Sequence, residues 1–140
     1  MADNSTPCMN PEIVYVGDQE MARVIRADFT PDKTTFITPN HYNHQLGYIV
    51  YSAGKTIPRH RHLPVERVVI GTSEVIMVKS GRCVADIYGD DNMLAASVEL
   101  RQGDVILFCA GGHGFRILED TILLEVKQGP YYTAPEKEFF

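Results

Sequence analysis

The sequence predicts an all-β domain in which antiparallel strands form a sandwich or a barrel. Short segments rich in Val, Ile, Tyr and Phe alternate with turn signals such as Ser80-Gly81 at intervals of roughly ten residues, as in such folds. No segment keeps a helical period, because Gly, Pro and β-branched residues interrupt the apolar pattern too often. One alternative stays open near the start of the chain, where residues 18–24 could form a short helix.

The expected strands are set by these turns, in chain order. Gly17-Asp18 separates the first two, a polar loop at 39–45 precedes the third, and Gly- or Asp-containing turns bound most of the others. The segments with strand composition are residues 12–16, 21–27, 45–53, 56–62, 66–70, 74–79, 82–88, 94–100, 104–109, 115–118 and 121–127. Residues 1–10 and 133–140 are expected to be tails, packed on the barrel or on a partner, of a single domain that spans residues 1–140.

Composition excludes several classes of protein. The 140 residues fit one hydrophobic core, and 13 basic against 18 acidic residues give a net charge of −5, which argues against a nucleic-acid surface. The apolar runs are too short to cross a membrane, and the polar residues 1–10 do not resemble a signal peptide, so we expect a cytoplasmic protein. Cys8, Cys83 and Cys109 are widely spaced, which indicates neither a disulfide framework nor a thiolate zinc site.

The histidines are the most informative residues. On a strand, His60 and His62 would point to the same side, where two imidazoles can bind one metal ion. The alternative is a pair of surface histidines. His113 lies among glycines after the predicted strand 104–109, and those glycines allow a sharp turn and a close backbone approach. His41 and His44 lack this spacing and are interpreted as part of a surface loop.

Two stretches of the chain resemble the two motifs of the cupin superfamily. In residues 54–81, Gly54 is followed after five residues by His60-Arg-His62, and a later Glu precedes Gly by six residues. In residues 103–115, Gly103, five residues and a Gly-rich bend lead to His113. Residues 111–131 further resemble small cupins found among bacterial polysaccharide and sugar-nucleotide biosynthesis genes. The resemblance implies a double-stranded β-helix, that is, a jelly-roll barrel.

The resemblance also implies one divalent metal ion, held by three histidines and a glutamate. The histidines would be His60, His62 and His113. For the carboxylate, Glu74 has the expected distance to the following Gly, whereas Glu66 has the expected distance from the histidines; the strand-like segment after Glu74 favours Glu74. The second motif departs from the family pattern, since Cys109 replaces its usual Pro and its last Asn is absent. Fe, Mn, Ni and Zn all suit such ligands, so the ligand set does not determine which metal ion binds.

These expectations lead to a leading function and two alternatives. The leading one is a metal-dependent enzyme that acts on a small carbohydrate-derived or carboxylate substrate. A non-catalytic sugar-binding module is the first alternative. A metal-free sugar isomerase or epimerase is the second, with a histidine and a tyrosine or carboxylate as acid and base. Candidate catalytic residues are Glu66, Glu125, Tyr48 and Tyr51. The partners expected are a small molecule and, because edge strands need covering, a second copy of the chain, but neither nucleic acid nor a membrane.

Overall fold

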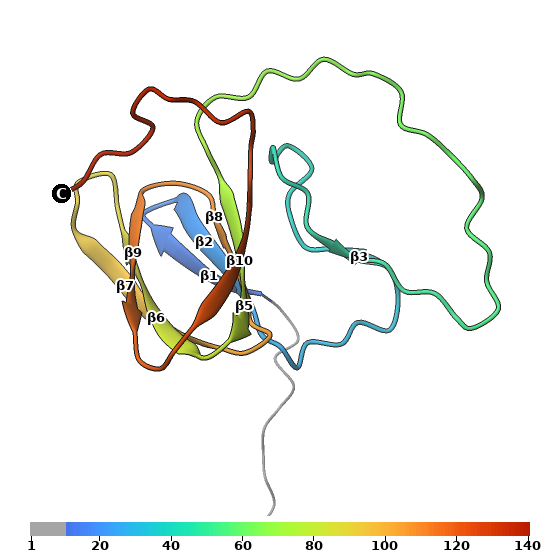
Figure 1. The fold of residues 1–140 in the computed structure, drawn as a ribbon, viewed down its shortest axis with the longest axis horizontal. Coiled ribbons are helices and arrows are strands. Elements are labelled where there is room, and N and C mark those ends of the chain that lie inside the picture. Colours follow the sequence, from blue (N-terminus) through green and yellow to red (C-terminus); the bar gives the residue numbers. More distant parts are fainter. Residues whose placement is uncertain (1–10) are drawn as a thin grey trace, which may run out of the picture. The chain divides into compact units, whose positions relative to one another are not determined.

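The structure is a computed structural model, and it describes residues 11–140. The predicted tail at residues 1–10, with Cys8, lies outside the described residues. The chain divides into two compact units. Residues 11–29 and Thr72–Phe140 belong to the first unit, and Thr30–Gly71 forms the second (Figure 1).

Two antiparallel sheets make up the first unit (Figure 1). A five-stranded sheet has the order β1-β2-β8-β5-β10, and a three-stranded sheet has the order β7-β6-β9. The strands are β1 (Glu12–Val16), β2 (Gln19–Ile25), β5 (Glu74–Ser80), β6 (Arg82–Tyr88), β7 (Leu94–Arg101), β8 (Val105–Phe108), β9 (Gly112–Ile117) and β10 (Ile122–Lys127). The all-β prediction is confirmed. Both sheets have edges, so this unit is an open pair of sheets, consistent with the sandwich that the sequence allowed beside a barrel, and it is not a closed barrel.

The core of the first unit lies between its two sheets. Ile76 and Val78 on β5 and Ile106 on β8 pack with Ala85 and Ile87 on β6, and all of these are buried. The alternation of buried and partly exposed residues along β5 is what a strand with one face on the core requires. Because β9 belongs to the same sheet as β6, its inner face and that of β5 point toward the same interior.

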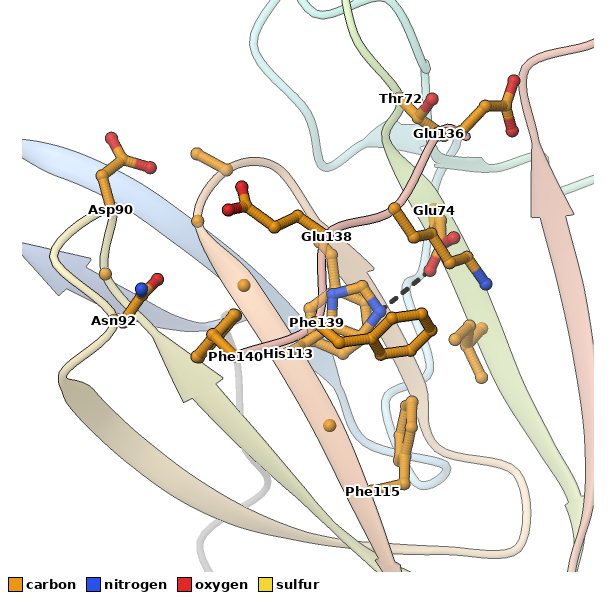
Figure 2. Close-up of a pocket in the computed structure, with 18 of the residues that line it drawn as sticks. Thr72, Glu74, Asp90, Asn92, His113, Phe115, Glu136, Glu138, Phe139 and Phe140 are labelled. Carbon is orange, nitrogen blue, oxygen red and sulfur yellow. Dashed lines mark ion pairs between the residues drawn. The ribbon is translucent and has the colours of Figure 1, made fainter. Parts of the chain in front are cut away.

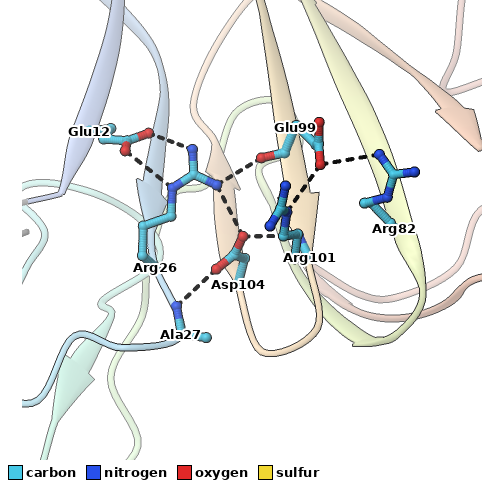
Figure 3. A network of polar contacts seen from close by, with 7 residues as sticks. All are labelled: Glu12, Arg26, Ala27, Arg82, Glu99, Arg101 and Asp104. Atoms are coloured by element: carbon cyan, nitrogen blue, oxygen red, sulfur yellow. Dashed lines mark hydrogen bonds and ion pairs between the residues drawn. The ribbon is translucent and has the colours of Figure 1, made fainter. Parts of the chain in front are cut away.

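A network of charged groups ties together strands that are distant in the sequence (Figure 3). Arg26, at the end of β2, donates through Nη1 to the Asp104 carboxylate at 3.0 Å and to the Glu99 carbonyl oxygen at 2.7 Å. Asp104 also accepts hydrogen bonds from the backbone N–H groups of Ala27 and Arg101. A buried carboxylate with several donors, one of them charged, fixes the ends of β2, β7 and β8.

The second unit corrects part of the sequence prediction. It contains two short paired strands, β3 (Thr35–Phe36) and β4 (Gly47–Tyr48), and no other strand among its residues. The strands expected at 56–62 and 66–70 are therefore wrong, and only two residues of the one at 45–53 are confirmed. The physical reason is that this segment pairs with no neighbouring strand, whatever the β-propensity of its residues.

The prediction of strands in the first unit is much better. The bounds of β1 and β6 agree with it, and those of β2, β5, β7, β8 and β10 differ by only a few residues. The alternative helix at 18–24 is wrong, because β2 pairs with β1 on one side and with β8 on the other.

Candidate functional site

One histidine and one glutamate meet in the interior of the first unit. Glu74 is the first residue of β5 in the five-stranded sheet, and His113 lies on β9 in the three-stranded sheet. Their side chains approach across the sandwich, with 3.0 Å between His113 Nε2 and Glu74 Oε2 (Figure 2). Both groups are largely withdrawn from solvent, with 11% of the Glu74 side chain and 27% of the His113 side chain exposed. A carboxylate in such a place needs a partner, and His113 is that partner.

The imidazole of His113 is held by its neighbours. Its ring stacks on that of Phe108, with centroids 3.8 Å apart and an interplanar angle of 8°, and Phe115 contacts it edge-on. The turn before it depends on Gly111, which has a φ of +67° and lies so close to the Tyr88 carbonyl oxygen that a Cβ would collide with it. The predicted close approach of the backbone next to His113 is thus confirmed.

A cavity of about 700 Å³ surrounds this pair, and all of its lining residues belong to the first unit. That volume is typical of a small-molecule site. Its walls come from β5, β8, β9 and β10, from the turn after β6 and from residues 136–140. Figure 2 labels lining residues from β5, β9, the turn after β6 and residues 136–140. Glu74 and His113 therefore face a space that a ligand can enter.

Glu125 is a second carboxylate at the same cavity. The sequence left open which face of β10 is buried; in the structure Glu125 pairs with the core residue Ile76 and so lies on the inner face. Its Oε1 is 3.5 Å from Lys127 Nζ. Glu125 is thus the candidate catalytic residue that lines the same cavity as Glu74 and His113.

The other two predicted metal ligands belong to the second unit. The rings of His60 and His62 lie side by side, with centroids 5.4 Å apart, although the strand that was expected to align them is absent. The Nδ1 of His60 donates to the Pro58 carbonyl oxygen, 2.9 Å away. A hydrogen bond of this kind at one ring nitrogen is typical of a histidine that binds a metal ion through the other nitrogen.

The remaining candidates also lie in the second unit. Glu66 and Tyr51 are exposed in the segment without strands. Tyr48 is on β4 and half-buried, and burial raises the pKa of its phenol. His41 and His44 lie in the loop between β3 and β4, as predicted. None of these is among the residues that line the cavity, all of which belong to the first unit.

The separation within the Glu74–His113 pair fits a shared metal ion. Two donors about 2.1 Å from one ion, at right angles to each other, are about 3 Å apart, which agrees with the 3.0 Å observed. Imidazole nitrogen and carboxylate oxygen suit Zn(II), Mn(II), Fe(II) and Ni(II). Within residues 11–140, no three His, Cys, Asp or Glu side chains gather into a group that could hold a metal ion.

Residues 136–140 form part of the cavity wall. The stretch 133–140 was expected to be a tail, packed on the barrel or on a partner, and it contains no strand, while Glu136, Glu138, Phe139 and Phe140 line the cavity. Phe140 also packs edge-on against Tyr88, with ring centroids 5.3 Å apart. Sequence reasoning did not identify these four as residues of the site.

Comparisons of the chain with protein-family models, curated proteins and solved structures found no match. Within the described part of the chain, no helix is long and apolar enough to cross a membrane.

Proposed function

We propose that the chain is a metal-dependent enzyme of the cupin type, which binds a divalent ion through Glu74 and His113 and acts on a small carbohydrate-derived substrate in the cavity. The observation that carries this proposal is the 3.0 Å contact between Glu74 and His113, made from opposing sheets at a cavity of ligand size. The cupin jelly roll, His60 and His62 as further ligands, and the carbohydrate nature of the substrate come from the motif resemblance.

The residues of the site have separate tasks in this proposal. Phe108 holds the His113 ring in plane, and the Gly111 turn sets its position, so the two ligand atoms keep their spacing without a substrate. A bound divalent ion would polarise a substrate oxygen or lower the pKa of a bound water. Glu125, which does not contact that pair, can take a proton from the substrate or return one to it.

Metal analysis of the purified protein tests the proposal. We expect about one equivalent of a divalent ion after reconstitution, and a loss of at least about tenfold in affinity for E74Q and for H113A, because each removes a ligand. The matched control is E66Q, which removes the rival carboxylate and should leave affinity unchanged. Separate H60A and H62A variants test the two ligands that the resemblance adds. Retention of metal by H113A would contradict the assignment.

A metal-free enzyme is the second candidate, and the same contact favours it. A carboxylate oxygen 3.0 Å from Nε2 orients the imidazole, and an imidazole oriented by a carboxylate is the arrangement of a general acid–base pair. Such a pair beside Glu125 is what a sugar isomerase or epimerase needs. Less than about a tenth of an equivalent of metal, unchanged by reconstitution, would exclude the metal-dependent enzyme and leave this candidate or a non-catalytic sugar-binding module.

We also propose that the chain forms a homodimer. The five-stranded sheet ends in two edge strands, β1 and β10, and exposed edges pair readily with another chain. On β10 the outward side chains Ile122, Leu124 and Val126 are all more than half exposed. An edge with an apolar outer face is a suitable surface for a second copy.

A further inference from the structure

Gln128 fastens the end of β10 to the start of β5. Its Oε1 accepts a hydrogen bond from the backbone N–H of Ser73 at 2.8 Å, and its Nε2 donates to the Ser73 Oγ at 2.9 Å. Both residues are half-buried, so water competes less for these bonds than it would on an open surface. One side chain thus holds the backbone and the side chain of the residue directly before Glu74.

These two bonds continue the β5–β10 pair beyond its last backbone partners. The register ends at Glu74 and Lys127, and in the same register Ser73 would lie opposite Gln128. Two residues after Gln128, Pro130 has no N–H and cannot extend the pairing. The end residues of a strand open most readily. Here the side-chain amide of Gln128 bonds to Ser73 at the point where the backbone pairing ends.

The start of β5 needs this support because of the segment before it and the residue that it carries. Residues 49–71 are exposed and contain no strand, so no backbone pairing steadies the chain as it approaches β5. Glu74, the first residue of β5, is buried, and its Oε2 lies 3.0 Å from His113 Nε2. Opening of the first residues of β5 would carry this carboxylate away from the imidazole.

We infer that Gln128 is a positioning residue for the Glu74 carboxylate and that it acts through Ser73. The inference rests on the proposed function, since it takes Glu74 and His113 to be the centre of the site. Thr72 and Glu74 line the cavity (Figure 2), whereas Ser73 and Gln128 do not. This agrees with the alternation of an extended chain, in which Ser73 points away from the side of its two neighbours. Gln128 therefore acts on Glu74 from outside the cavity.

NMR of the metal-free protein gives the first test. The ring signals of His113 report on its contact with Glu74, and they are recorded at about pH 8, where a free imidazole is neutral. In Q128A, which removes both bonds, we expect these signals to move toward their positions in E74A, because the carboxylate leaves its place. S73A removes the Oγ bond and keeps the N–H bond, so it should move them less. Unchanged His113 signals in Q128A would overturn the inference.

Zinc affinity gives the second test, with T121V as the matched control. For Q128A we expect the affinity for Zn²⁺ to be at least about tenfold below that of the wild type, because residues that orient a metal ligand contribute on that scale. T121V removes the hydrogen bond from Thr121 Oγ1 to the Glu119 carbonyl oxygen, 2.7 Å away, at the other end of β10. It should lower the midpoint of urea unfolding as Q128A does, yet leave zinc affinity and the His113 signals unchanged.

The two tests separate this inference from the proposed function. Moved His113 signals in Q128A, together with no zinc binding by the wild type, would reject the metal-dependent function alone. Zinc binding by the wild type with equal affinity in Q128A would reject this inference alone. Equal losses of zinc affinity in Q128A and T121V would mean that any loosening of β10 weakens the site, and that result also rejects the inference.

Discussion

Asp86 on β6 shows how one ion pair contributes to the acid stability of the first unit. Arg116 donates to both of its carboxylate oxygens, at 2.7 and 2.9 Å, and Ser97 donates at 2.6 Å. These bonds, those of Arg116 above all, lower the pKa of Asp86 from 3.8 to about 2. Because the folded pKa lies below the unfolded one, the charged carboxylate stabilises the fold fully above about pH 4. That contribution is lost as the pH falls from about 4 to about 2.

Replacing Arg116 tests this pH window. In R116Q we expect the pKa of Asp86 to rise from about 2 toward its ordinary 3.8, since Arg116 is the largest cause of the shift. The free energy of unfolding should fall relative to the wild type at neutral pH, and the difference should vanish near pH 2. NMR titration of the Asp86 carboxyl and urea unfolding across pH measure the two effects.

The control for that experiment is another arginine of the same unit. Arg101 contacts Glu99 and not the Asp86 carboxylate, so R101Q should leave the pKa of Asp86 at about 2. If Asp86 of the wild type titrated near 3.8, Arg116 would not be stabilising the charged form of the Asp86 carboxyl.

Some residues of the candidate site could be predicted and others could not. His113 and Glu74 stand in motifs with distinctive spacing, so the sequence singled them out, and the structure places them in contact. Phe139 and Glu138 stand in no motif. Their place at the cavity depends on where the chain runs after β10, and local sequence does not encode that path.

The turn that delivers β9 depends on one glycine. Gly111 has a φ of +67°, and a Cβ there would collide with the Tyr88 carbonyl oxygen and lie 2.8 Å from Met21 Sδ. G111A should lower the free energy of unfolding by about 2–4 kcal/mol, from left-handed strain and a clash with backbone that cannot move aside. Urea unfolding measures this loss.

Gly114, which lies on β9 three residues after Gly111, is the matched control. A Cβ at this position has no atom within 4 Å, and its backbone has no positive φ. G114A should therefore change the free energy of unfolding by less than about 1 kcal/mol. Equal losses in G111A and G114A would mean that glycine matters on β9 in general and not through the Gly111 turn.

The limits of prediction at the level of elements are clearest between residues 56 and 70. Two strands were predicted in this segment, yet it contains none, whereas β5 and β6 were predicted with nearly correct bounds. Composition reports a preference for extended backbone, and a strand also needs a neighbour to accept its hydrogen bonds. That neighbour is remote in sequence, so the periodicity of a single segment cannot show whether it exists.

For the molecule as a whole, the order of the strands in the two sheets determines that the residues of the site meet. The motif that holds Glu74 and the motif that holds His113 are separated by three strands, and they meet because β5 and β9 belong to opposing sheets. An alternating pattern predicts that each strand has an inner face. It does not predict which inner faces oppose each other, because that follows from the pairing order of the strands.

The same topology leaves β10 at an edge, and this leads to a prediction about assembly. The outward side chains Ile122, Leu124 and Val126 are exposed by 58%, 52% and 54%. In antiparallel pairing of two β10 strands, Glu125 of each copy can lie opposite Lys127 of the other, which adds charge complementarity to the apolar contact. We expect a dimer in light scattering coupled to size exclusion.

Charge placed on that edge should separate the two copies. L124K puts a charge into the apolar outer face of β10 in each copy, and it should give a monomer with an unchanged circular dichroism spectrum. The control Y15K adds the same charge to β1, the opposite edge of the sheet, at a tyrosine that is 54% exposed. Y15K should remain a dimer. A dimer that is lost in Y15K and kept in L124K would place the contact at β1, and a monomeric wild type at about 100 µM would exclude both edges as sites of stable pairing.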